Sequence, residues 1–221
     1  MATGITRRKT RQHDTVRGPE LPPPPARTWG PGWGASGPTE DELRRERLWQ
    51  DLLQDGWRAE IVGGRIIVSP WAKRRHGVLL DRLADQLYDV KRKNGWEFHQ
   101  CWAVHIPPER GDKRLPDLLV APPDCPEFDD NQAYGYGTLM AVEVTSSDSR
   151  HDDLNIKPAK YARAGIPVML ILDDFSERPS VRLLCDLLAG EYQTSVIAES
   201  GQPVELPEPF GIKLETDLIF R

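Results

Sequence analysis

The feature that most constrains this chain is a pair of carboxylates set inside two short apolar runs. Asp117 lies in residues 115–120 (LPDLLV), and Glu143 lies in residues 140–144 (MAVEV). Both runs predict short buried strands. A desolvated carboxylate is costly unless it is paired, hydrogen-bonded or bound to a metal. Because Lys157 follows closely in the sequence, the two acids predict a site for a hard cation.

Length and composition indicate an ordinary water-exposed globular protein. The chain has 221 residues, of which 38% are hydrophobic and 29% charged, which is sufficient for one domain with a full core. No apolar run approaches the roughly 20 residues of a membrane span, and no apolar segment follows the basic N-terminus to make a secretory signal. We therefore expect a cytoplasmic protein without a membrane partner.

The cysteines and the net charge exclude further classes. Cys101, Cys125 and Cys185 form no C-x-x-C pair, so neither a zinc site nor a disulfide framework is expected. The net charge is −5, and residues 1–39 hold six basic and two acidic residues. The remainder is therefore strongly acidic, which argues against a general nucleic-acid coat. Such a body can still bind a phosphate backbone through a local basic strip.

The chain divides into a tail and one folded part. Residues 1–38 are basic and rich in proline and glycine, a composition that predicts a disordered tail. Residues 39–221 are expected to form a single domain.

Hydrophobic periodicity predicts the elements of that domain. The expected helices cover residues 39–54, 76–93 and 154–164, and the expected strands cover residues 96–106, 115–120, 139–145 and 167–172. A hairpin turns at Gly63-Gly64 and a C-terminal hairpin turns at Gly190. Residues 113–114 and 122–137 are expected to be loops. This order predicts an α/β (α+β) fold with a mixed β-sheet flanked by helices.

Three basic residues, Lys73, Arg74 and Arg75, precede the second predicted helix. Positive charge at a helix N-terminus opposes the helix dipole. Two interpretations remain open at this point: a solvated face, or a set of contacts to phosphate.

Several residues together resemble a known family. They are Glu60 with Gly64-Arg65, residues 68–70 (VSP), His76, Pro116-Asp117, residues 142–144 (VEV), Ser146, Asp153, Lys157, Tyr161, Gly165 and Pro167. In this order they resemble the Uma-two family, whose members are regarded as endonucleases with a restriction-endonuclease-like, PD-(D/E)xK fold. The resemblance covers roughly residues 55–220.

The resemblance implies metal-dependent hydrolysis of phosphodiester bonds in DNA. Asp117 and Glu143 would bind Mg²⁺, with Mn²⁺ as an alternative and the Val144 carbonyl as a further ligand. The metal would activate a water and stabilise charge on the phosphate. A homodimer is compatible with cleavage of both strands, but the sequence shows no interface.

The chain departs from the superfamily pattern at Thr145, where the Glu-x-Lys element has lysine. The resemblance assigns the catalytic lysine to Lys157 on the following helix instead. Supporting roles are open for Glu60, Asp153, Tyr161 and His76. Each has a plain structural alternative: Asp153 and Lys157 as an ordinary i,i+4 pair, Tyr161 as core packing, His76 as a helix-start residue and Glu60 on an exposed hairpin face.

Two other functions stay open. One is a catalytically inactive nuclease fold that binds nucleic acid or a partner protein, which Thr145 and the acidic body favour. The other is a small-molecule phosphoesterase, which would need a closed pocket. The first of these is distinguished from the endonuclease by whether Asp117, Glu143 and Lys157 converge on one spot beside a basic groove.

Overall fold

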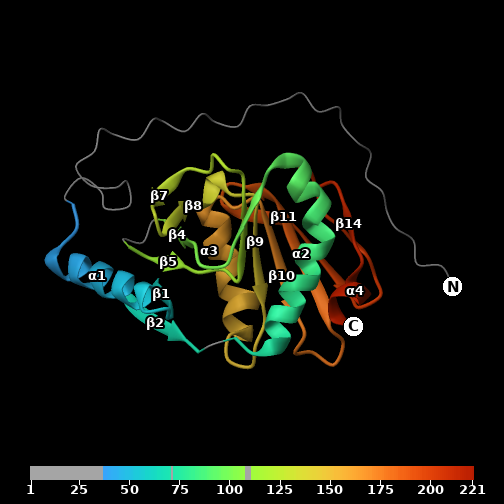
Figure 1. Ribbon diagram of the computed structural model, residues 1–221, viewed down its shortest axis with the longest axis horizontal. Helices are drawn as coiled ribbons and strands as arrows, with labels where there is room; N and C mark the ends of the chain where they lie inside the picture. Colours follow the sequence, from blue (N-terminus) through green and yellow to red (C-terminus); the bar gives the residue numbers. More distant parts are fainter. Residues whose placement is uncertain (1–36, 71, 108–110) are drawn as a thin grey trace.

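The structure is a computed structural model that describes residues 37–221 except 71 and 108–110. The expected disorder of residues 1–38 therefore falls almost entirely outside the described residues. Two six-stranded sheets, one short strand pair and four α-helices make up the described part (Figure 1).

The sheet that carries the two acids is mixed. In spatial order its strands are β12 (Glu191–Glu199), β11 (Ser180–Leu188), β10 (Val168–Asp173), β9 (Met140–Val144), β6 (Leu118–Ala121) and β3 (Glu97–His99). Only the central pair, β9 and β10, is parallel, and every other pairing is antiparallel. β6 and β9 are antiparallel neighbours with Leu118 opposite Val142. Asp117 and Glu143 therefore lie side by side at the same end of these two strands.

Both faces of this sheet are buried, which explains its continuous apolar runs. On one face Leu79, Leu83 and Leu87 of α2 (Arg74–Asn94) pack against alternate strand residues, and α4 (Thr216–Phe220) completes this layer. On the other face lies Tyr161 of α3 (Lys157–Ala164). The strand pair β13 (Val204–Glu205) and β14 (Lys213–Leu214) leads into α4.

The second sheet brings further side chains to the same region. Its spatial order is β2 (Arg65–Ser69), β1 (Arg58–Val62), β5 (Lys113–Arg114), β4 (Ala103–His105), β8 (Gln132–Tyr134) and β7 (Glu127–Asp129). Helix α1 (Glu40–Gln54) covers it and places Trp49 against Ala59, Ile61 and Leu115. A capping box of Thr39 and Glu42 begins α1. The Gly63-Gly64 turn has positive φ at both glycines, as a two-residue hairpin requires.

Three expectations about the elements were wrong. Residues 96–106 form not one strand but two, β3 and β4, which pair in different sheets. The expected loop at residues 122–137 contains β7, β8 and the 3-10 turn η2 (Gly135–Gly137). Lys113 and Arg114 lie in the buried strand β5 rather than in a loop. In the last two cases a short polar strand gains its stability from its partners in the sheet rather than from its own hydrophobic pattern.

A buried ion pair fastens α1 to this second sheet. The Lys113 side chain is 1% exposed, and its Nζ lies 2.6 Å from both carboxylate oxygens of Glu46 on α1. The ammonium also lies 4.1 Å from the centre of the Trp49 ring. Burial lowers the pKa of Lys113, although Glu46 opposes that effect. The contacts that hold this charge, Glu46 and Trp49, both come from α1, and the charge of Asp129 on β7 adds to them.

We expect Lys113→Met to lower the free energy of unfolding by about 3 kcal/mol, because it leaves Glu46 half-enclosed without its cation. The double variant with Glu46→Leu should recover most of that loss, since both charges are then absent. Urea unfolding of the two single variants and the double variant measures the coupling. Additive losses would contradict the pairing.

The buried imidazole of His105 predicts a loss of stability in acid. Burial and the nearby Lys113 ammonium lower its pKa from 6.5 to about 4. Below pH 6.5 the unfolded chain therefore binds a proton at this residue that the folded chain does not, so stability falls as the pH drops. Between pH 6.5 and 4.5 the wild type should lose about 2 kcal/mol more than His105→Gln. Parallel pH profiles for the two proteins would contradict this assignment.

Candidate active site

Asp117 is held at the start of β6 by contacts to both of its carboxylate oxygens. Oδ1 accepts a hydrogen bond from the Arg58 guanidinium at 2.9 Å and lies 3.2 Å from Nε2 of His76. Oδ2 accepts from the Val144 backbone N–H at 2.8 Å. Burial alone would raise the pKa of Asp117, but the hydrogen bond from His76 and the charge of Arg58 outweigh burial and lower it. Asp117 is therefore an ionised carboxylate at neutral pH.

Glu143 lies on the adjacent strand with its side chain toward α3. Its Oε1 accepts a 2.6 Å hydrogen bond from the Tyr161 hydroxyl, and its Oε2 lies 2.8 Å from Nζ of Lys157. Burial raises the pKa of Glu143 well above its usual value, Lys157 opposes this effect, and the charges of Asp117 and Asp153 add to it. The ionised form of Glu143 is thus favoured by nearby cations such as Lys157 and disfavoured by burial.

Lys157 is buried between two carboxylates. Its Nζ lies 2.8 Å from Oε2 of Glu143 and 2.9 Å from Oδ1 of Asp153, one helical turn earlier. Burial would lower the pKa of Lys157, but the charges of Glu143, Glu60 and Asp153 raise it well above the usual range. Lys157 therefore stays an ammonium, which excludes it as a general base near neutral pH.

The backbone before α3 sets the direction of these side chains. A turn at residues 146–149, closed by the Ser146 and Ser149 hydroxyls, leads into one π-helical turn, η3 (Asp152–Ile156), which continues into α3. Neither Asp152 nor Asp153 caps the helix, because the residue at the cap position is His151 and it makes no side-chain cap bond. The wider π turn places Asp153 inside the protein, where it is 1% exposed.

A second network lies beside the first and comes largely from the other sheet. The Arg114 guanidinium contacts Glu60 at 3.0 Å and Asp152 at 2.8 Å. Glu60 also accepts a hydrogen bond from the Leu115 backbone N–H at 2.8 Å. The charge of Glu60 acts on both Lys157 and Tyr161. Glu60 is thus engaged with protein groups and does not lie on an exposed hairpin face.

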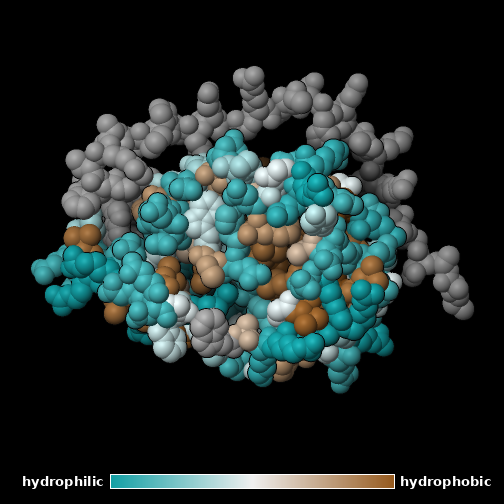
Figure 2. All heavy atoms as spheres, in the orientation of Figure 1, coloured by the Kyte–Doolittle hydropathy of each residue, from teal (hydrophilic) through white to brown (hydrophobic). Residues whose placement is uncertain are grey.

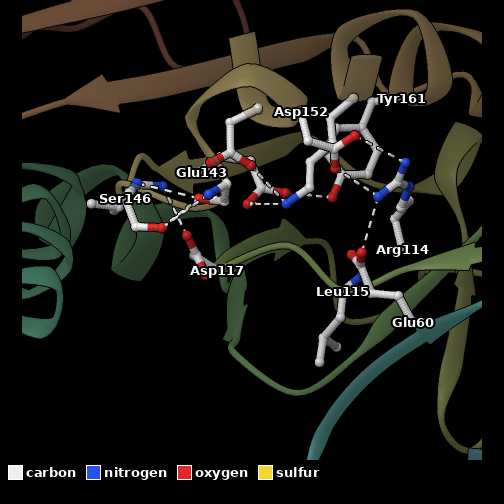
Figure 3. A network of polar contacts seen from close by, with 12 residues as sticks. Glu60, Arg114, Leu115, Asp117, Glu143, Ser146, Asp152 and Tyr161 are labelled. Carbon is white, nitrogen blue, oxygen red and sulfur yellow. Dashed lines mark hydrogen bonds and ion pairs between the residues drawn. The ribbon is translucent and has the colours of Figure 1, made fainter. Parts of the chain in front are cut away.

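Figure 3 shows the two networks meeting in one place. Glu143 lies on β9, Asp152 in η3 and Tyr161 on α3. Glu60 and Arg114 lie on strands of the other sheet, and Leu115 directly follows β5. Together the networks contain five carboxylates, those of Glu60, Asp117, Glu143, Asp152 and Asp153, and three permanent cations, those of Arg58, Arg114 and Lys157. The site therefore has more carboxyl groups than permanent cations.

Among the candidate residues, Thr145 is the one whose side chain bonds outside the two networks. Its hydroxyl donates to Asp173 Oδ1 at 2.8 Å, and Arg150 contacts the same carboxylate at 2.7 Å. The position that carries lysine in the superfamily pattern therefore contributes to a neighbouring ion pair. His76 contacts Asp117, so it is more than a helix-start residue.

The three basic residues before α2, Lys73, Arg74 and Arg75, do not all have the same role. Arg75 is bound to Asp174 and to the backbone carbonyl of Phe220, so its role is to hold the chain end against α2. Lys73 and Arg74 are exposed at the start of the helix, next to His76. These two side chains remain candidates for contact with an anion.

The carboxylate oxygens of the site are the type of ligand that a hard divalent cation prefers. Among the described residues, no three His, Cys, Asp or Glu side chains already converge as metal ligands. Oxygen donors on two adjacent strands and the excess of carboxylates nevertheless match what Mg²⁺ prefers. Because Lys157 contacts Oε2 of Glu143, a cation there has to compete with the ammonium.

The sequence analysis missed Arg58 and Arg114. Arg58 lies two residues before Glu60 on the same strand, so a strand that directs Glu60 toward the site directs Arg58 there too. The alternation of side chains along the strand therefore indicates that Arg58 lies near the site. No such pattern indicates Arg114, because its strand has only two residues.

No helix among residues 37–221, apart from the undescribed positions, is long and apolar enough to cross a membrane. Among curated proteins, none matches the chain. A crystal structure described as "a putative nuclease belonging to DUF820 from Anabaena variabilis ATCC 29413" has a similar fold, with a TM-score of 0.56 at 14% sequence identity. The similarity covers 73% of this chain and 89% of that chain.

The family model described as "Putative restriction endonuclease", Uma2, matches residues 45–218. This range begins within α1, ends within α4 and includes both networks of the site. Because the match covers most of the chain, the chain belongs to the Uma2 family. It has a restriction-endonuclease-like fold, which is similar to that of the solved protein.

Proposed function

We propose that the protein is a Mg²⁺-dependent endonuclease that hydrolyses phosphodiester bonds in DNA. The observation that carries this proposal is the convergence of Asp117, Glu143 and Lys157 from two strands and a helix, with Lys157 Nζ 2.8 Å from Glu143. Membership of a family described as putative restriction endonucleases supports a nucleic-acid substrate.

Asp117 and Glu143 are the residues that would hold the cation, with the Val144 carbonyl as a further oxygen donor. Mg²⁺, or Mn²⁺ in its place, would lower the pKa of a bound water and offset charge on the phosphate. The hydrogen bond from Val144 N–H to Asp117 and that from Tyr161 to Glu143 fix the two carboxylates before any ligand binds. Such preorganisation reduces the cost of reaching the reactive geometry.

Lys157 would act as a fixed cation. Its raised pKa keeps it protonated, so it can orient a water or stabilise charge that develops on the phosphate, but cannot remove a proton. Asp153 would hold Lys157 when Glu143 binds the metal, since it provides the second carboxylate contact at 2.9 Å.

A binding protein without catalysis is the second candidate. One observation favours it: every oxygen of Asp117 and Glu143 already has a protein partner. If those contacts cannot open, the acids serve only the fold. The two functions differ in whether Mg²⁺ binds and whether DNA is cleaved.

Glu143→Gln should lower Mg²⁺-dependent nicking of a supercoiled plasmid by at least about 100-fold, because the amide keeps the shape and the Tyr161 contact but loses a charged metal ligand. Glu205→Gln, at an exposed position on β13, should keep full activity. Agarose-gel assays at several Mg²⁺ concentrations give the rates. Equal nicking by wild type and Glu143→Gln would reject the proposed site, whereas no nicking by the folded wild type with Mg²⁺ or Mn²⁺ would favour the binding protein.

Lys157→Met should separate catalysis from metal binding. Cleavage should fall by about 100-fold, since a cation near the phosphate is lost. The affinity for Mn²⁺, measured by isothermal titration calorimetry, should stay equal or rise, because the ammonium no longer competes for Glu143. Lys93→Met, at the exposed end of α2, is the charge-matched control. A large loss of Mn²⁺ affinity in Lys157→Met alone would show that Lys157 supports the metal site instead of competing with it.

A further inference from the structure

Arg58 is the permanent cation of the candidate active site that a ligand can reach most easily. Its side chain is 24% exposed, whereas those of Lys157 and Arg114 are 9% and 5% exposed. Among the described residues, Lys157 and Arg114 each contact two carboxylates, and Arg58 contacts one. Arg58 is therefore the least enclosed of the three positive charges, and it has the fewest negative partners.

The guanidinium of Arg58 is held through one of its three nitrogens. Nη2 donates to Oδ1 of Asp117 at 2.9 Å and to the Leu115 carbonyl at 3.2 Å. These two bonds use both N–H groups of Nη2. No described residue accepts a hydrogen bond from Nη1 or Nε of Arg58. The remaining N–H groups lie in one fixed plane, which suits the oxygens of a phosphate.

The edge of the second sheet leaves Arg58 accessible. Arg58 pairs with Ser69 of the edge strand β2, so the two side chains point to the same side of the sheet. Ser69 is exposed, so β2 leaves Arg58 open on this side. Figure 2 shows hydrophilic residues over most of α1 and α2, the helices on either side of the hairpin in this view. The surroundings of the hairpin on this face are thus mostly polar, which suits a charged ligand.

The start of α2 lies beside Arg58. His76 contacts the same oxygen of Asp117 as Arg58 does, at 3.2 Å, compared with 2.9 Å for Arg58. Lys73 and Arg74, which precede His76 by three and two residues, are exposed. Arg58 therefore lies near two further accessible cations. Together they form a local basic region in an otherwise acidic protein, as contact with a phosphate backbone requires.

Arg58 and a metal ion compete for the same oxygen of Asp117. Oδ2 of Asp117 is bonded to the Val144 backbone N–H in a buried position, whereas Oδ1 faces the partly exposed Arg58 and His76. Oδ1 is thus the oxygen that an incoming cation can reach. A cation at Oδ1 offsets the negative charge of the carboxylate and weakens its attraction for Arg58. The released guanidinium keeps its own charge beside any phosphate that the cation binds.

We propose that Arg58 is a phosphate-binding residue, which exchanges Asp117 for the substrate phosphate when the cation binds. This inference rests on the proposed function and adds a substrate contact to it. Without the cation, Asp117 holds Arg58. With the cation in place, Arg58 donates to a non-bridging oxygen of the phosphate. The exchange provides the accessible positive charge that Thr145 does not supply, and it makes phosphate binding depend on the cation.

The first test releases Arg58 without a metal. Asp117→Asn removes the charge that holds the guanidinium, with little change in shape. In EDTA this variant should bind a short fluorescein-labelled DNA duplex about tenfold more tightly than wild type, which is the size of one charge-assisted hydrogen bond. Fluorescence anisotropy measures the affinity. In the Arg58→Met background, Asp117→Asn should change the affinity by less than about twofold, because no guanidinium is released.

Glu143→Gln is the matched control for this cycle. It removes a charge of the same sign from the same site, but Glu143 does not contact Arg58. Its effect on DNA affinity in EDTA should therefore be the same with Arg58 and in the Arg58→Met background. A general loss of repulsion between the acidic site and DNA would give this result for both carboxylates, whereas release of Arg58 gives it for Glu143 alone.

The second test keeps Asp117 and uses Ca²⁺ as the cation. Ca²⁺ should increase the DNA affinity of wild type about tenfold more than that of Arg58→Met, since only the wild type has a guanidinium to release. In Ca²⁺ the slope of log affinity against log salt should be smaller by about one in Arg58→Met. Arg58→Lys, which keeps the charge without the planar fork, should recover part of the effect. Arg92→Met, at the far end of α2, is the charge-matched control and should behave as wild type.

The two tests distinguish this exchange from the proposed function. An equal effect of Asp117→Asn with and without Arg58, an equal effect of Ca²⁺ on wild type and Arg58→Met, or no DNA binding by any folded variant would overturn the proposal. If the wild type nicks plasmid with Mg²⁺ and Arg58→Met has the same rate and DNA affinity, the nuclease stands and the role of Arg58 is rejected. If the wild type nicks nothing but Arg58 and Asp117 are coupled in DNA binding, the phosphate contact stands without catalysis. Thermal unfolding shows which variants are folded.

Discussion

The Lys157 ammonium, buried between Glu143 and Asp153, is the interaction on which the site depends. Three carboxylates of the first network, including Asp117, lie in a region with little water, and such a group is costly without positive charge. The ammonium lies within 2.9 Å of two of them, and its own pKa is raised by the same carboxylates. A cation bound by Glu143 would replace one of these contacts and leave the other in place. In the proposed function, Glu143 would therefore exchange one protein cation for a metal while Asp153 keeps the ammonium in place.

The two-sheet architecture explains why these groups meet. Asp117 and Glu143 lie at the same end of two neighbouring strands, because β6 pairs with β9 in one sheet. Arg58, Glu60 and Arg114 come from the other sheet, and they reach the site only if α1 and the hairpin dock correctly. Lys113, enclosed by Glu46 and Trp49, fixes that docking, and it directly precedes Arg114. A change in the buried pair between α1 and β5 would therefore alter the geometry around Lys157, although no residue of that pair touches it.

Sequence reasoning predicts the parts of this structure that are encoded locally. An acid inside an apolar run marks Asp117 and Glu143, and the four-residue spacing places Asp153 and Lys157 on one face of a helix. The same reasoning fails where pairing between distant segments determines the structure. The expected strand at residues 96–106 divides between two sheets. The polar strand of Lys113 and Arg114 is buried only because neighbouring elements cover it. The contact of Thr145 with Asp173 likewise depends on the parallel pairing of β9 with β10, which no local pattern reveals.

An acidic protein that binds nucleic acid needs attraction that does not come from its overall charge. Beyond residue 39 the chain is strongly acidic. In the basic group before α2, Arg75 is paired with Asp174, which leaves Lys73 and Arg74 as the exposed cations that could meet an anion near the site. Contacts to phosphate weaken steeply as salt is added. A metal at Asp117 and Glu143 would supply positive charge at the one phosphate where cleavage is proposed. That charge would offset part of the repulsion that an acidic surface exerts on a nucleic-acid strand.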